Sequence, residues 1–123
     1  MKRNMPHRVL IVDDSPISRR LLSHVLSKFG CRVSFAVTLA EADALISDQK
    51  FDMVILDAQL PDGDGFAFCR KLREQVSDLP VIFYTATDTP EIRVKAEQSG
   101  GSAFIVKTRN LDLLMAAVSK ILS

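Results

Sequence analysis

Short apolar runs that end abruptly at polar residues recur along the chain. A continuous apolar run bounded by turn residues is typical of a strand that is buried on both faces. The clearest run, Met53–Leu56, ends at Asp57 and is followed by a turn rich in Pro, Gly and Asp. Such runs predict strands at residues 8–14, 51–57, 80–86 and 102–107, and a loose alternation of apolar and polar residues predicts a fifth strand at 31–37.

Apolar residues at helical spacing fill the intervals after these strands and predict five helices. Pro16 and Pro90 stand at first helical positions, and Thr38 and Glu41 have the spacing of a capping box. The predicted capping residues are Ser15, Thr38, Thr89 and Asn110. The predicted inward stripes are Ile17, Leu21, Leu22, Val25, Leu26 and Phe29; Leu39, Ala42, Leu45 and Ile46; Phe66, Cys69 and Leu72; Ile92, Val94 and Ala96; and Leu114, Val118 and Ile121.

Strict alternation of strands and helices predicts an α/β fold with a parallel sheet covered on both faces. Right-handed crossovers leave few topologies, and the expected one is a doubly wound (βα)₅ flavodoxin-like sandwich with strand order 2-1-3-4-5. Nothing in the pattern indicates a linker, a repeat or a second domain. We therefore expect a single domain over residues 1–123, with its core at about 8–122.

Composition narrows the classes of function. Apolar residues make up 47% of the chain, which is enough for a real core, and the net charge of +1 gives no support to a nucleic-acid-binding surface. No window approaches a transmembrane span, so no membrane partner is expected. Cys31 and Cys69 lack metal or redox spacing and fit a reducing compartment. These features predict a cytoplasmic protein.

The predicted strand order brings polar side chains to one edge of the sheet. Asp13, Asp14 and Asp57 end neighbouring strands, and Thr85 and Lys107 end the next two. Three carboxylates in one crevice repel one another and need a cation, and oxygen ligands without His or Cys favour Mg²⁺. A hydroxyl and an ammonium opposite the cation can hold phosphoryl oxygens, and Asp can itself become an aspartyl phosphate.

In order and spacing, these motifs resemble those of the receiver domains of two-component response regulators, including the chemotaxis regulators. The resemblance covers about residues 8–122. The matching residues are Asp13-Asp14, Asp57 with Leu60-Pro61-Asp62-Gly63-Asp64-Gly65, Thr85-Ala86 and Phe104-Ile105-Val106-Lys107. The resemblance implies a signalling module of a phosphorelay, rather than an enzyme acting on a separate substrate.

The resemblance also implies roles for these residues. Asp57 would accept a phosphoryl group from a histidine kinase or histidine phosphotransfer protein. Mg²⁺ would be held by Asp14, Asp57 and the backbone carbonyl of Gln59, with Asp13 acting through water. The phosphate would be bound by the two remaining strand-end residues, Thr85 and Lys107.

Other implied roles concern switching and output. Phe104 would be an aromatic switch that turns inward when Thr85 moves, while Gln59 and Thr87 would flank the site and tune the lifetime of the phosphate. A phosphorylation-dependent homodimer through the last two helices and the strand between them is suggested, as is a fused or separate output partner. Leu111 and Met115 predict an apolar strip on the last helix, which either serves a partner or extends the core.

Two other classes of function share part of this pattern. A Mg²⁺-dependent aspartyl phosphatase would carry an acid two residues after the nucleophile, where this chain has Gln59. A flavin- or dinucleotide-binding module would need a glycine-rich loop after the first strand, where this chain has Asp13, Asp14, Ser15 and Pro16. A degenerate receiver that acts only as an interaction module is the third alternative.

One position departs from the family pattern, because Thr108 stands where Pro usually follows the lysine. A cis peptide bond costs roughly 2.5–4 kcal/mol before Thr, against about 0.5–1 kcal/mol before Pro. We therefore predict a trans Lys107–Thr108 bond, a looser loop and slower phosphorylation, which Thr108→Pro would speed.

Overall fold

The computed structural model describes residues 6–107 and 111–123. Its main sheet is built from β1 (Arg8–Val12), β2 (Arg32–Ala36), β3 (Met53–Leu56), β6 (Val81–Thr85) and β7 (Ala103–Val106). The helices are α1 (Pro16–Ser27), α2 (Leu39–Asp48), α3 (Gly65–Gln75), α4 (Pro90–Gln98) and α5 (Asp112–Leu122). A small hairpin, β4 (Gln59–Leu60) and β5 (Gly63–Asp64), follows β3.

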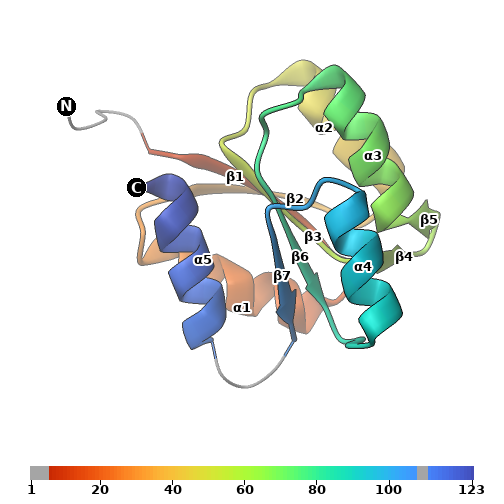
Figure 1. The fold of residues 1–123 in the computed structure, drawn as a ribbon. Coiled ribbons are helices and arrows are strands. Elements are labelled where there is room, and N and C mark those ends of the chain that lie inside the picture. Colours follow the sequence, from red (N-terminus) through yellow and green to blue (C-terminus); the bar gives the residue numbers. More distant parts are fainter. Residues whose placement is uncertain (1–5, 108–110) are drawn as a thin grey trace.

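The five strands of the main sheet are parallel and lie in the order β2-β1-β3-β6-β7. Helices α1 and α5 cover one face, and α2, α3 and α4 cover the other (Figure 1). The α/β flavodoxin-like fold is therefore confirmed, and β6 and β7 are the predicted fourth and fifth strands. The carboxyl ends of all five strands meet at one edge of the sheet, as they must when neighbours are parallel.

Side chains of the central strands point alternately to the two faces. Leu10, Val54 and Phe83 join the core under α2, α3 and α4, whereas Ile11 and Ile55 join the core under α1 and α5. Because both faces are covered, both sets are apolar. This explains why the sequence shows continuous apolar runs there instead of alternation.

Three of the predicted helix caps are present. The hydroxyls of Ser15, Thr38 and Thr89 accept hydrogen bonds from the backbone N–H groups three residues later, at 3.2, 3.1 and 3.2 Å. The capping box of α2 differs in detail, because the carboxylate of Glu41 accepts from the backbone N–H of Val37 at 3.1 Å. The predicted cap at Asn110 lies outside the described residues.

The structure corrects three predictions about burial and local structure. The turn after β3 contains the β4–β5 hairpin, which the sequence pattern did not reveal. Ile17, predicted to face inward, is 82% exposed and stands in the first turn of α1. Val94 is 49% exposed, because residues spaced by two cannot share one face of a helix with both Ile92 and Ala96.

The apolar strip predicted at Leu111 and Met115 has two interpretations, a surface for a partner or an extension of the core. Leu111 packs against the core under α1 and α5, as the core-extension alternative requires. Leu113, which the sequence pattern did not single out, is instead 70% exposed. Within the described helix, Leu114 and Val118 are fully buried, as predicted.

Helix α4 should exchange its backbone amide hydrogens faster than α1. Its only buried residue is Ala96, whereas α1 buries Leu22, Val25 and Leu26. Few buried contacts allow local opening at low free energy. Hydrogen exchange followed by mass spectrometry or NMR checks this, and equal protection of the two helices would contradict it.

Gly65→Ala should destabilise the protein by about 2 kcal/mol, a typical cost of overpacking. A Cβ at Gly65 would lie 2.5 Å from the carbonyl oxygen of Asp57 and 3.1 Å from Cα of Ala58, and neither backbone atom can move freely. Gly30→Ala is the control, because its Cβ would meet no atom within 4 Å and its positive φ alone costs ~1 kcal/mol. Urea unfolding measures both; an equal or smaller loss in Gly65→Ala would disprove the steric argument.

Candidate functional site

Three carboxylates lie together where β1 and β3 end. Asp13 and Asp14 follow β1, Asp57 follows β3, and these two strands pair directly. One carboxylate oxygen from each of the three lies within 4.8 Å of the others. Among the residues that the structure describes, this is the one cluster of three potential metal ligands. The predicted convergence of the three acids is thus present in the fold.

Lys107 reaches this cluster from the far edge of the sheet. It follows β7, and its Nζ lies 2.9 Å from Oδ2 of Asp57, to which it donates a hydrogen bond. The same Nζ forms an ion pair with Oδ2 of Asp13 at 2.8 Å. The lysine side chain is only 18% exposed, so water screens these contacts weakly.

Burial shifts the proton affinities of this group. Asp13 is 1% exposed, and desolvation raises the pKa of its carboxyl although Lys107 and the N–H of Ser15 oppose this. Burial alone would lower the pKa of Lys107, but the carboxylates of Asp13 and Asp57 together raise it. The ammonium therefore stays charged between its two partners.

The donor set fits a divalent cation. When ionised, the three carboxylates face a single ammonium, which leaves two negative charges in excess. Oδ2 of Asp13 is fully buried and, although it is close to Lys107, it accepts no well-aligned hydrogen bond. All ligands offered are oxygens, the kind that Mg²⁺ prefers, and Asp14 is exposed to incoming water. These residues could hold Mg²⁺.

Local hydrogen bonds hold the loop that carries Asp13. Its Oδ1 accepts from the backbone N–H of Ser15 at 2.9 Å, and its carbonyl accepts from the guanidinium of Arg19 at 3.0 Å. Ser15 in turn caps α1. The sequence pattern did not reveal this role of Arg19, because an arginine in a polar helix turn carries no signal that it folds back onto a strand end.

Thr85 ends β6, the strand between those that lead to Asp57 and Lys107. It is 3% exposed, and its carbonyl accepts from the backbone N–H of Lys107 at 2.7 Å. The two predicted phosphate-binding residues are therefore tied to each other through the backbone. Gln59 and Thr87 are exposed, and the N–H of Gln59 donates to Oδ1 of Asp57 at 3.2 Å.

Phe104 lies on β7 opposite Phe83 and is partly buried against the core under α4. The guanidinium carbon of Arg93 stands 4.9 Å from the centre of its ring. Arg93 also pairs with Asp88, through Nε and Oδ1 at 2.7 Å. Arg93 thus joins α4, the loop after β6 and the predicted switch residue, and the sequence pattern did not reveal these contacts.

Three other observations do not concern the acidic cluster. A hollow of about 780 Å³, lined by Ile46, Phe51 and Leu79 among others, lies at the opposite edge of the sheet, where β3 and β6 begin, and takes no part in the acidic cluster. No helix in the described ranges is long and apolar enough to cross a membrane. The predicted trans bond at Lys107–Thr108 falls outside the described residues and stays a prediction.

Comparison with known proteins identifies the family of this chain. The family model for the response regulator receiver domain matches residues 9–119. The transcriptional regulatory protein YvcP of Bacillus subtilis (strain 168) is 34% identical over 116 residues, which cover 94% of this chain and 48% of YvcP. The chain spans about half the length of the curated relatives it matches.

Solved structures agree with the sequence comparisons. The non-phosphorylated HemR receiver domain from Leptospira biflexa superposes with a TM-score of 0.86 at 32% identity, covering 95% of this chain and 94% of that one. The response regulator TrrA from Thermotoga maritima, in complex with Mg²⁺ and BeF, gives a TM-score of 0.85 at 29% identity, with 94% and 98% covered. With its family match, its fold and its acidic site in agreement, this chain belongs to the response regulator receiver domains, the signalling modules of two-component systems.

Proposed function

We propose that Asp57 is the phosphoacceptor and takes its phosphoryl group from a histidine kinase or a histidine phosphotransfer protein. The observation that carries this proposal is the contact of Oδ2 of Asp57 with the ammonium of Lys107. Two further carboxylates lie beside this contact, at the edge where the carboxyl ends of the strands meet. Asp57 is 9% exposed, so a rigid strand holds a carboxylate that a donor can still reach. Asp57 also lies directly after a fully buried strand.

Transfer would proceed by attack of a carboxylate oxygen of Asp57 on phosphorus. A P–O bond forms as the P–N bond of the donor phosphohistidine breaks, and the bonding pair returns to the imidazole nitrogen. When the other ring nitrogen is protonated, neutral imidazole leaves. The ammonium of Lys107 can pair with the carboxylate of Asp57 before transfer and with the new phosphoryl oxygens after it. The hydroxyl of Thr85 lies on β6, between the strands that lead to Asp57 and Lys107.

Mg²⁺ would be held by Asp14, Asp57 and the carbonyl of Gln59, with Asp13 acting through water; when bound, it neutralises charge on the phosphoryl oxygens. Its support is the excess of negative charge and the poorly satisfied Oδ2 of Asp13. Within the chain, the ion pair of Lys107 with Asp13 opposes the desolvation that raises the pKa of the Asp13 carboxyl. The same module would release the phosphate by hydrolysis, with Gln59 and Thr87 tuning access of water.

Phosphorylation would switch the surface formed by α4, β7 and α5, with Phe104 following the movement of Thr85. Support comes from the contact that joins Phe104 to Arg93 of α4, and from the exposed apolar residues Val94 of α4 and Leu113 of α5. A homodimer through this surface is part of the proposal. Curated relatives are about twice as long and include transcriptional regulators, which supports an output domain fused to this one.

We also propose that the protein resides in the cytoplasm. Cys31 and Cys69 are both unpaired in the fold, as expected in a reducing compartment such as the cytoplasm.

Incubation with an acyl-phosphate donor and Mg²⁺ tests the function against its alternatives. A receiver gives an adduct on Asp57 that is stable to acid and labile to base. Rapid turnover without an adduct would indicate an aspartyl phosphatase, and no reaction would indicate a degenerate receiver or a binding module. Gln59 disfavours the phosphatase, because it offers no acid two residues after the nucleophile.

Asp57→Asn should abolish phosphorylation and leave the fold intact. The change is nearly isosteric, but an amide oxygen is a poor nucleophile. Labelling from an acyl-phosphate donor and circular dichroism measure the two outcomes, with Asp78→Asn, at an exposed loop position, as the control. Undiminished labelling of Asp57→Asn would refute the assignment.

Asp14→Ala should weaken Mg²⁺ binding at least as much as loss of a supporting residue does, which is about 10–100-fold. Asp14 is the exposed member of the acidic cluster, so its removal leaves no buried cavity. Calorimetric titration with Mg²⁺ measures the change, and Asp78→Ala removes the same charge far from the site. Equal affinities in both variants would exclude Asp14 as a ligand.

A further inference from the structure

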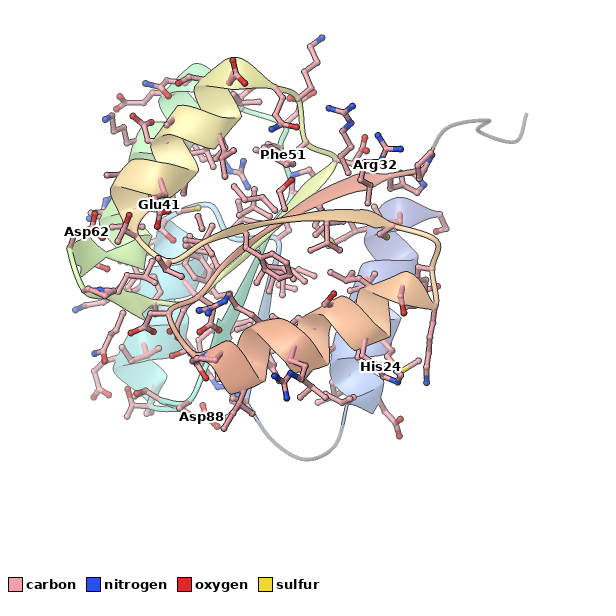
Figure 2. The ribbon with its side chains drawn as sticks, turned by 180° about the vertical axis from the view of Figure 1, so that it is seen from behind. His24, Arg32, Glu41, Phe51, Asp62 and Asp88 are labelled. Atoms are coloured by element: carbon pink, nitrogen blue, oxygen red, sulfur yellow. The ribbon has the colours of Figure 1, made fainter. Side chains whose placement is uncertain are left out.

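Asp62, at the turn of the β4–β5 hairpin, reaches a helix that begins 23 residues earlier in the chain. Its Oδ1 accepts a hydrogen bond from the backbone N–H of Leu39 at 2.8 Å, and its Oδ2 accepts from that of Ala40 at 3.1 Å. Figure 2 shows Asp62 beside the start of α2, close to Glu41. One exposed carboxylate thus bridges two separate elements.

These two bonds complete the N-terminus of α2. The first N–H groups of a helix have no partner within it. Thr38, the helix's own cap, accepts only from the N–H of Glu41, so the N–H groups of Leu39 and Ala40 are left for Asp62. The negative charge also suits the positive end of the helix dipole.

The charged form of Asp62 is the one that forms this bridge. Hydrogen bonds from the backbone, that of Leu39 first, hold the pKa of its carboxyl below the ordinary value. At neutral pH the carboxylate is therefore ionised and accepts from both N–H groups.

The hairpin that Asp62 holds is small. It contains two residue pairs, Gln59 with Asp64 and Leu60 with Gly63. A ladder of this length is not stable alone. At its base the N–H of Gly65 donates to the carbonyl of Ala58 at 2.8 Å, and at its turn the anchor is Asp62 on α2.

The hairpin also borders the acidic cluster. Gln59, its first residue, donates its N–H to Oδ1 of Asp57 at 3.2 Å and would offer its carbonyl to Mg²⁺. Asp62 lies only five positions after Asp57, with Gln59 between them, so a shift of the turn would move the Gln59 backbone.

We propose that Asp62 is a positioning residue, which fixes the hairpin against α2 and so aims the carbonyl of Gln59 at the metal site. This inference rests on the proposed function, because it concerns the affinity of the same site for Mg²⁺. Loss of residues that orient metal ligands typically weakens binding about 10–100-fold, and a bridge through an exposed loop belongs at the low end of that range.

Three variants test the bridge. Asp62→Ala removes both acceptors, Asp62→Asn keeps one oxygen that can accept from Leu39, and Asp48→Ala removes an exposed carboxylate from the other end of α2. Calorimetric titration should show Mg²⁺ affinity about tenfold weaker in Asp62→Ala, partly restored in Asp62→Asn and unchanged in Asp48→Ala. Without Mg²⁺, the amides of Leu39, Ala40 and Gln59 should exchange faster in Asp62→Ala.

Phosphorylation kinetics separate positioning from general damage to the fold. In Asp62→Ala the Mg²⁺ concentration for half-maximal labelling by an acyl-phosphate donor should rise about tenfold, while the rate at saturating Mg²⁺ stays near that of the wild type. If Asp62→Ala lowers the stability but leaves the Mg²⁺ affinity at the wild-type value, the inference is wrong and the proposed function still stands. A wild-type protein that neither binds Mg²⁺ nor becomes labelled would overturn the proposed function, and the inference with it.

Discussion

The candidate site depends on one interaction, the pairing of the Lys107 ammonium with the carboxylates of Asp13 and Asp57. A buried charge is costly unless it is paired, and here the partners oppose the desolvation that disfavours the charged forms of Asp13 and Lys107. The pair also spans the sheet, since β3 and β6 lie between the strands that lead to Asp13 and Lys107. Any change in strand order or register would therefore separate these charges.

Parallel packing turns this pairing into a site. Because β1, β3, β6 and β7 all run in one direction, their polar ends gather at one edge while their apolar bodies stay in the core. When ionised, the three carboxylates outnumber the single ammonium, so the cluster suits a divalent cation. In the proposed function, the residues that hold the fold's polar edge together are the ones that carry the chemistry.

Two contacts extend from this edge to the helices on one face. Asp62 joins the loop after Asp57 to the start of α2, and Arg93 covers the ring of Phe104 from α4. Both are exposed polar side chains that bridge separate elements. The first contact links the loop beside the acidic cluster to α2, and the second links β7 to α4.

The sequence alone determined the five strands of the main sheet, the five helices, the fold and the strand-end residues. Apolar period and capping residues act within a few positions, so the pattern around Ser15 or Thr38 could be read locally. Tertiary structure decided three other features: the hairpin that begins at Gln59, the hydrogen bond from the Leu39 N–H to Asp62, and the exposure of Ile17. These depend on which distant elements pack together, and a carboxylate in a polar turn looks the same in sequence whether it meets water or the end of a helix.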